Sequence, residues 1–148
     1  MGTRRSFILR LLALCGCGNL VLAGCEAPSD APTPIRRVRL GSLGEFTAPS
    51  RILFLERVLV RRDERGISAM SLTCTHQSCM VQKQSSENDE YLCPCHGSRF
   101  DPSGKLLQGP AQRDLPWLPL EIDNTQQIWA TFGSPVTSEW RLSIPAPA

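Results

Sequence analysis

Hydrophobic residues in this chain come in short runs that end at glycine, proline or charged residues, a pattern typical of strands joined by turns. Residues 52–61 are apolar enough to form one buried strand. Arg62–Gly66 is a turn signal, from which a second strand would return as a hairpin. We expect further strands at residues 35–40, 67–72, 91–92, 117–122 and 127–132, and residues 140–144 to close the domain. No segment shows a convincing helical period, so the pattern predicts an all-β fold.

Composition agrees with this prediction. The chain has 148 residues, 12 prolines and 11 glycines, which suits one domain with many turns. Its net charge is +2, and it becomes 2 − 3 = −1 if the first 24 residues and their three arginines are removed. A nearly neutral domain gives no electrostatic reason to expect a nucleic-acid partner. We expect the arginines at 57, 61, 62 and 65 to form a solvated strand and turn edge.

The N-terminus has the features of an export signal. Residues 3–9 read Thr-Arg-Arg-Ser-Phe-Ile-Leu and resemble a twin-arginine signal, and a mainly apolar run follows at residues 11–23. Leu-Ala-Gly-Cys at 22–25 resembles a bacterial lipobox, which implies that Cys25 is lipidated and becomes the first mature residue. The alternative is an uncleaved membrane helix, although the run is short and interrupted by Gly16, Gly18 and Asn19.

Both alternatives place the mature protein on the periplasmic side of a bacterial cell envelope, anchored to a membrane. We therefore expect a signal at residues 1–24 and an anchor with a proline-rich linker at 25–37. The domain itself would occupy residues 38–148.

The residues most able to bind a metal, cysteine and histidine, lie in two short sequence motifs, here called boxes. Of seven cysteines, four lie at Cys74, Cys79, Cys93 and Cys95, and the two histidines of the chain, His76 and His96, lie among them. The boxes read Cys-Thr-His-Gln-Ser-Cys at 74–79 and Cys-Pro-Cys-His-Gly-Ser-Arg-Phe at 93–100.

Three interpretations compete for these boxes. Zinc is one, although zinc motifs usually pair Cys with Cys and His with His. A disulfide with incidental histidines is the second, and an iron–sulfur cluster with two Cys on one iron and two His on the other is the third.

Both boxes resemble those of the Rieske family, and the similarity continues to Gly-Pro-Ala at 109–111. It is strong over about residues 73–112 and loose elsewhere. The resemblance implies one [2Fe–2S] cluster per chain, with Cys74 and Cys93 on one iron and His76 and His96 on the other. It also implies a fold of antiparallel sheets with an inserted cluster-binding subdomain of paired loops.

The resemblance is closest to the iron–sulfur subunits of quinol–cytochrome c reductases, in which a disulfide joins the two loops. It implies a disulfide between Cys79 and Cys95, and a hydrogen bond from Ser98 to a cluster sulfur. Phe100 stands where a tyrosine is usual, which predicts a lower reduction potential, and Ser78 replaces a usual glycine.

By this resemblance, His76 and His96 would accept the proton of a quinol while the cluster takes its electron. The partners would be quinol, a cytochrome b-type membrane subunit and a c-type cytochrome. A tethered electron carrier for another periplasmic oxidoreductase, such as a molybdenum enzyme, is the alternative. A ferredoxin-like donor to an oxygenase is disfavoured by the export signal and the disulfide pair.

Overall fold

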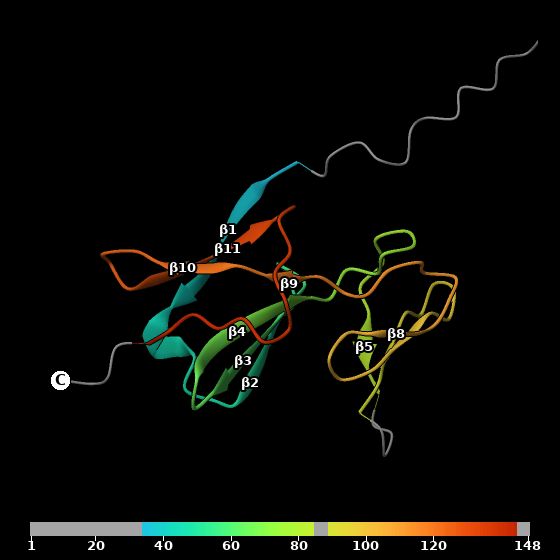
Figure 1. Cartoon of the computed structure of the whole chain (residues 1–148), viewed down its shortest axis with the longest axis horizontal. Helices are drawn as coiled ribbons and strands as arrows, with labels where there is room; N and C mark the ends of the chain where they lie inside the picture. Colours follow the sequence, from blue (N-terminus) through green and yellow to red (C-terminus); the bar gives the residue numbers. More distant parts are fainter. Residues whose placement is uncertain (1–33, 85–88, 145–148) are drawn as a thin grey trace, which may run out of the picture. The chain divides into compact units, whose positions relative to one another are not determined.

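A computed structural model describes residues 34–84 and 89–144 of the chain. The predicted signal, Cys25 and most of the predicted linker lie outside these residues. The described part consists of antiparallel strands in three sheets, with one short 3₁₀ helix, η1 (Leu43–Glu45), as its only helix (Figure 1). None of its helices is therefore long enough or apolar enough to cross a membrane. The predicted all-β fold with antiparallel sheets is confirmed.

The first sheet joins the two ends of the domain. It contains β1 (Arg36–Ser42), β11 (Gln127–Phe132) and β10 (Leu120–Ile122), in the order β1-β11-β10. Because β1 begins at Arg36, the last two residues of the predicted linker belong to a strand.

The second sheet has the order β2-β3-β4-β9, with β2 (Ser50–Leu53), β3 (Val58–Asp63), β4 (Gly66–Ser71) and β9 (Trp117–Leu118). Alternate residues of a strand point to opposite faces. In β4, Ile67 and Ala69 enter the core shared with the first sheet, whereas Met70 enters a second core. All residues of β4 are therefore buried, which explains why its sequence shows no polar alternation.

The prediction of a single strand at 52–61 is wrong. A turn separates β2 from β3, and Arg57 takes a left-handed conformation there, with φ 55°. Phe54 and Leu55 lie at this turn and are 71% and 94% exposed. Their apolar side chains made the turn look like part of a buried strand.

The predicted strand at 117–122 is also divided. Pro119 has no N–H to donate, and the strands on either side of it, β9 and β10, belong to different sheets. The 140–144 segment forms no strand and contributes one isolated bridge, from Leu142 to Ile67.

The third sheet is small and carries the two boxes. It has the order β5-β6-β7-β8, with β5 (Gln82–Lys83), β6 (Tyr91–Leu92), β7 (Arg99–Phe100) and β8 (Leu106–Gln108). These strands follow β4 and precede β9 in the chain, so the sheet is an insertion into the second sheet. Strands of two or three residues are too short to show the alternation of apolar and polar residues that identifies a strand. This is why β5, β7 and β8 were not predicted.

Candidate metal centre

The two boxes fold into loops with the same backbone frame. In the first, Cys74 donates its N–H to the carbonyl of Cys79 over 2.8 Å, and Ser78 donates to the carbonyl of Cys74 over 3.0 Å. In the second, Cys93 donates to the carbonyl of Ser98 over 2.8 Å, and Gly97 donates to that of Cys93 over 2.9 Å. The residue four positions after the first cysteine is left-handed in both loops, with φ 57° at Ser78 and 76° at Gly97.

This frame buries two thiols and exposes two imidazoles. Cys74 and Cys93 are only 2% and 1% exposed and carry free thiols. His76 and His96 are exposed, and their ring centroids lie 4.7 Å apart with the planes at 84°. Each loop therefore contributes one thiol and one imidazole, and the two imidazoles lie side by side.

The surroundings of Cys74 are suited to a metal ligand. Burial raises the pKa of this thiol, and the neighbouring Cys93 raises it further, although the His76 backbone N–H and the Ser98 hydroxyl oppose the rise. A bare thiolate is unfavourable in such a place, and a bound cation would compensate its charge. The donor set of two thiols and two imidazoles thus fits a metal centre with mixed ligation.

The predicted disulfide between Cys79 and Cys95 is confirmed, with their Cα atoms 6.5 Å apart. The sulfurs of Cys79, Cys93 and Cys95 lie within 4.8 Å of one another. Because the first and last are bonded together, Cys93 is the one of these three with a thiol free for a metal. The disulfide joins the two ligand loops directly.

A buried serine connects the second loop to the segment at 109–111. Ser98 is fully buried, and its hydroxyl accepts the N–H of Ala111 over 2.9 Å. The hydrogen bond from Ser98 to a cluster sulfur stays a prediction, and the structure shows the hydroxyl bound to the N–H of Ala111.

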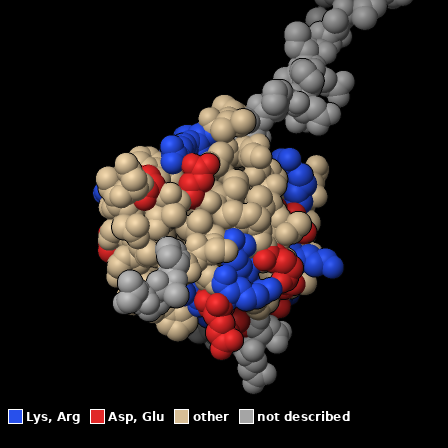
Figure 2. Space-filling view, turned by 60° about the vertical axis from the view of Figure 1, so that its left-hand side comes forward, with Lys and Arg blue, Asp and Glu red and all other residues tan. Residues whose placement is uncertain are grey.

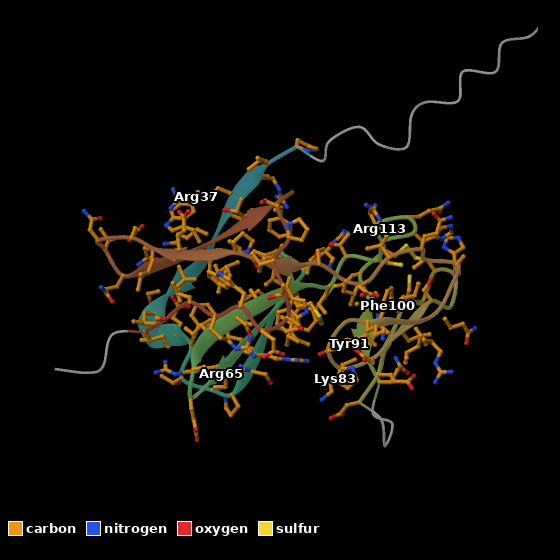
Figure 3. All side chains as sticks on the ribbon, in the orientation of Figure 1. Arg37, Arg65, Lys83, Tyr91, Phe100 and Arg113 are labelled. Atoms are coloured by element: carbon orange, nitrogen blue, oxygen red, sulfur yellow. A yellow bond between two sulfur atoms is a disulfide. The ribbon has the colours of Figure 1, made fainter. Side chains whose placement is uncertain are left out.

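Phe100 is fully buried in the same core as Cys74 and Cys93. In Figure 3 it lies beside Tyr91, its partner on the neighbouring strand of the small sheet. The hydroxyl of Tyr91 accepts a hydrogen bond from Arg61, so it is engaged by the second sheet.

The prediction that the arginines form a solvated edge is wrong for two of the four, Arg61 and Arg62, which are half-buried, whereas Arg57 is exposed as expected. Arg57 donates to the carbonyl of Ser78 over 2.8 Å. Arg61 is half-buried and donates to the carbonyl of Pro102 while lying over the ring of Trp117 at 5.5 Å. These side chains fasten the cluster-binding insertion to the second sheet.

Arg62, also half-buried, donates to the carbonyl of Phe46, which belongs to the core shared by the first and second sheets. Arg65 is exposed as expected. No local sequence signal identifies these partners, since they lie far away in the chain. Charges of both signs are otherwise interspersed on the surface, as Figure 2 shows for one face.

Sequence comparison finds relatives among iron–sulfur subunits. One relative is a protein of Haloferax mediterranei that is named as the Rieske subunit of a respiratory nitrate reductase. It is 39% identical over 75 residues, which are 48% of this chain and 33% of that protein. The ubiquinol–cytochrome c reductase iron–sulfur subunit of Bradyrhizobium diazoefficiens is 40% identical over 55 residues, 37% of this chain and 31% of that protein. The matches thus span about a third of these relatives.

A crystal structure of a plasma membrane Rieske protein from Synechocystis PCC 6803 matches with 32% identity and a TM-score of 0.42, covering 63% of this chain and 97% of that one. The family model of the Rieske [2Fe–2S] domain matches residues 41–119, more than half of the chain, and includes both loops. The chain therefore belongs to the Rieske family of electron-transfer domains, which bind a [2Fe–2S] cluster.

Proposed function

We propose that Cys74 and Cys93 bind one iron of the cluster and that His76 and His96 bind the other. The burial of the two thiols and the exposure of the two imidazoles support this division. It gives one iron a shielded sulfur environment and leaves the other iron at the protein surface.

Metal and sulfide analysis of the purified chain tests this assignment. Two irons and two sulfides per chain are expected, together with the low-average-g EPR signal of mixed His and Cys ligation in the reduced form. Cys74→Ser or His96→Ala should abolish that signal. One tightly bound zinc without an EPR signal would contradict the assignment.

The function that the site supports best is electron transfer from quinol to a c-type cytochrome, within a quinol–cytochrome c reductase. The observation that carries this proposal is the exposed pair of histidines, whose ring centroids lie 4.7 Å apart. When bound, the cluster supplies one-electron redox chemistry. His76 and His96 present their rings to solvent, where one of them can accept a hydrogen bond, and then the proton, from a quinol hydroxyl.

The buried thiols and the disulfide hold the two histidines in a fixed position, so that quinol meets a preorganised acceptor. The catalytic unit would be the complex, in which a cytochrome b-type subunit supplies the quinol site. The N-terminal sequence supports a membrane tether on the periplasmic side of the cell envelope through Cys25, followed by the linker at 25–37. A reductase subunit of this kind needs such a tether to stay near its membrane partner.

Affinity purification of the full-length chain from detergent-solubilised membranes tests this function. We expect b- and c-type haems to co-purify and the preparation to reduce cytochrome c with quinol. Recovery of a molybdenum enzyme instead, without haem b, would contradict the reductase.

That second outcome would support the alternative, a tethered carrier for another periplasmic oxidoreductase. The specific observation in its favour is the relative from Haloferax mediterranei that carries the name of a respiratory nitrate reductase subunit. The disulfide suits both functions, since both operate outside the cytoplasm.

A further inference from the structure

The two ligand loops share a backbone frame but differ in what stabilises it. At the left-handed position, the second loop has Gly97, which adopts positive φ without strain. The first loop has Ser78 there, and a side chain with a β-carbon disfavours this conformation. Something outside the first loop must therefore offset the strain at Ser78.

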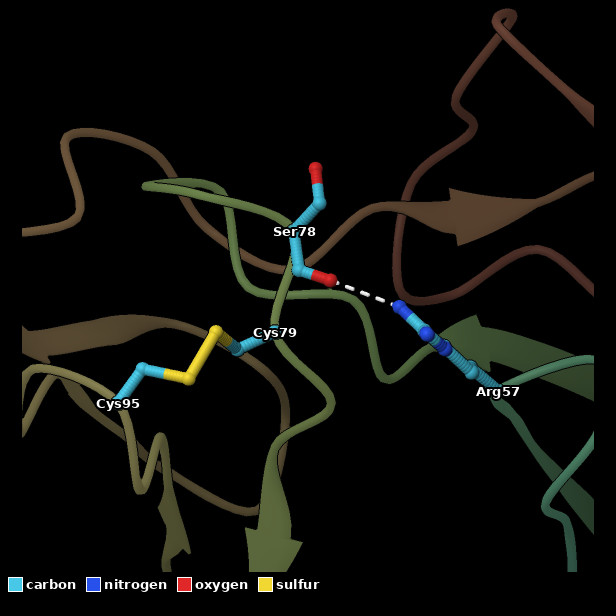
Figure 4. Close-up of a disulfide and its surroundings, with 4 residues drawn as sticks. All are labelled: Arg57, Ser78, Cys79 and Cys95. Atoms are coloured by element: carbon cyan, nitrogen blue, oxygen red, sulfur yellow. Dashed lines mark hydrogen bonds between the residues drawn. A yellow bond between two sulfur atoms is a disulfide. The ribbon is translucent and has the colours of Figure 1, made fainter.

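Arg57 makes the contact that can do so. Its guanidinium donates from Nη1 to the carbonyl of Ser78 over 2.8 Å, immediately before Cys79 of the disulfide (Figure 4). The hydrogen bond fixes the orientation of the peptide between Ser78 and Cys79. A charged donor on a carbonyl is a stronger restraint than a neutral donor.

The backbone of Arg57 holds the other end of the same loop. Its carbonyl accepts the N–H of Leu72 over 2.7 Å, two residues before Cys74. Arg57 thus touches the chain just before the first ligand and again just after His76. Both contacts are made by Arg57, which lies in the turn between β2 and β3 and itself has a left-handed backbone conformation.

The charge of Arg57 also lies beside the ligand loop. Among residues 34–84 and 89–144, the structure shows no ion pair to this guanidinium, in contrast to Arg65, which pairs with Glu139 over 2.9 Å. A positive charge near a redox centre stabilises its reduced, more negative state, and so raises its potential. Solvent screens an exposed charge, which makes this effect modest.

We propose that Arg57 is a positioning residue of the cluster site. Through the Ser78 carbonyl it holds the first ligand loop in its binding conformation, and its charge raises the reduction potential. The proposal rests on the ligands assigned above but on neither quinol nor a partner protein.

The test compares variants of the full-length holoprotein by chelator-driven cluster loss and by redox titration. Arg57→Gln should lose its cluster about tenfold faster than the wild type and have a lower potential. Arg57→Lys should recover the potential but only part of the retention, because an ammonium keeps the charge without the planar guanidinium geometry. Arg65→Gln removes an equal charge from the turn between β3 and β4, away from the ligand loops, and should change neither property.

The same substitution of Arg57 in a protein that also carries Ser78→Gly isolates the role of Ser78. Ser78→Gly removes the strain, so Arg57→Gln with Ser78→Gly should keep its cluster nearly as well as the wild type while its potential stays low. This double variant also decides the case if Arg57→Gln alone yields no holoprotein.

Wild-type retention and potential in Arg57→Gln would overturn the proposal, as would equal losses in Arg65→Gln or no rescue by Ser78→Gly. An error in the ligand assignment is distinguishable, since the wild type itself would then lack the EPR signal of mixed ligation.

Discussion

The backbone N–H of Ala111 donates to the hydroxyl of Ser98 over 2.9 Å, which ties the segment at 109–111 to the second ligand loop. Because the oxygen of Ser98 accepts this bond, its own hydrogen remains available for the predicted bond to a cluster sulfur. The serine is fully buried, so water cannot replace the bond to Ala111.

Replacing Ser98 with Ala should lower the reduction potential. The hydrogen bond to sulfur strengthens as the sulfur gains negative charge, so its loss destabilises the reduced state more than the oxidised state. We expect a decrease on the order of tens of millivolts, measured by protein-film voltammetry. The N–H of Ala111 also loses its partner, so cluster retention should fall too. An unchanged potential would mean that the hydroxyl does not act on the sulfur.

Phe100→Tyr should raise the potential by a similar amount, about tens of millivolts, if the new hydroxyl reaches a ligand sulfur. Phe100 is fully buried in the core that contains both ligand cysteines, so a hydroxyl added to its ring lies in that core. Tyr91→Phe is the matched control, because it removes a hydroxyl from the neighbouring strand that instead accepts a bond from Arg61. Redox titration should show a shift in the first variant and none in the second.

Loss of either half of the disulfide should weaken cluster retention. The bond closes a span of 16 residues between Cys79 and Cys95. A cross-link of this length contributes roughly 3 kcal/mol. The single variants Cys79→Ser and Cys95→Ser should lose the cluster at similar rates, and the double variant should be no worse, since one bond is lost in all three. Additive losses, measured as bleaching of the visible spectrum, would contradict this expectation.

Gly104→Ala should destabilise the domain. Gly104 has φ 86°, and a β-carbon there would collide with the sulfur of Met70 and lie 3.1 Å from Cβ of Leu115. Strain and overpacking together should cost about 2–4 kcal/mol in the free energy of unfolding. Gly44→Ala is the control, because nothing lies within 4 Å of its added carbon. Denaturant unfolding of both variants should show a large loss at Gly104 and a small change at Gly44.

The proposed anchor depends on Cys25. Cys25→Ser should prevent lipidation and leave the precursor uncleaved at this site, as followed by mass spectrometry of the membrane fraction. Replacing Arg4 and Arg5 with Lys should stop export of the holoprotein, because the twin-arginine route carries folded proteins. Normal processing of the Cys25→Ser chain would favour an ordinary signal or an uncleaved helix.

The sequence alone was sufficient to predict the cluster-binding chemistry and the strand-rich fold. Each ligand box spans only a few residues, so the order of Cys, His and glycine or serine within it is visible locally. Long strands such as β1 and β11 were also predictable, because several consecutive residues carry their pattern.

Tertiary structure decided the features that depend on residues far apart in the chain. The turn after Leu53 was hidden because Phe54 and Leu55 are apolar yet exposed. The division at Pro119 depends on two sheets that meet only in the folded domain. The contact from Arg57 to Ser78 spans 21 positions, and no periodicity within either segment encodes it. Folding brings these partners together because β4 packs into both cores, and the turn between β2 and β3 of the same sheet lies against the first ligand loop.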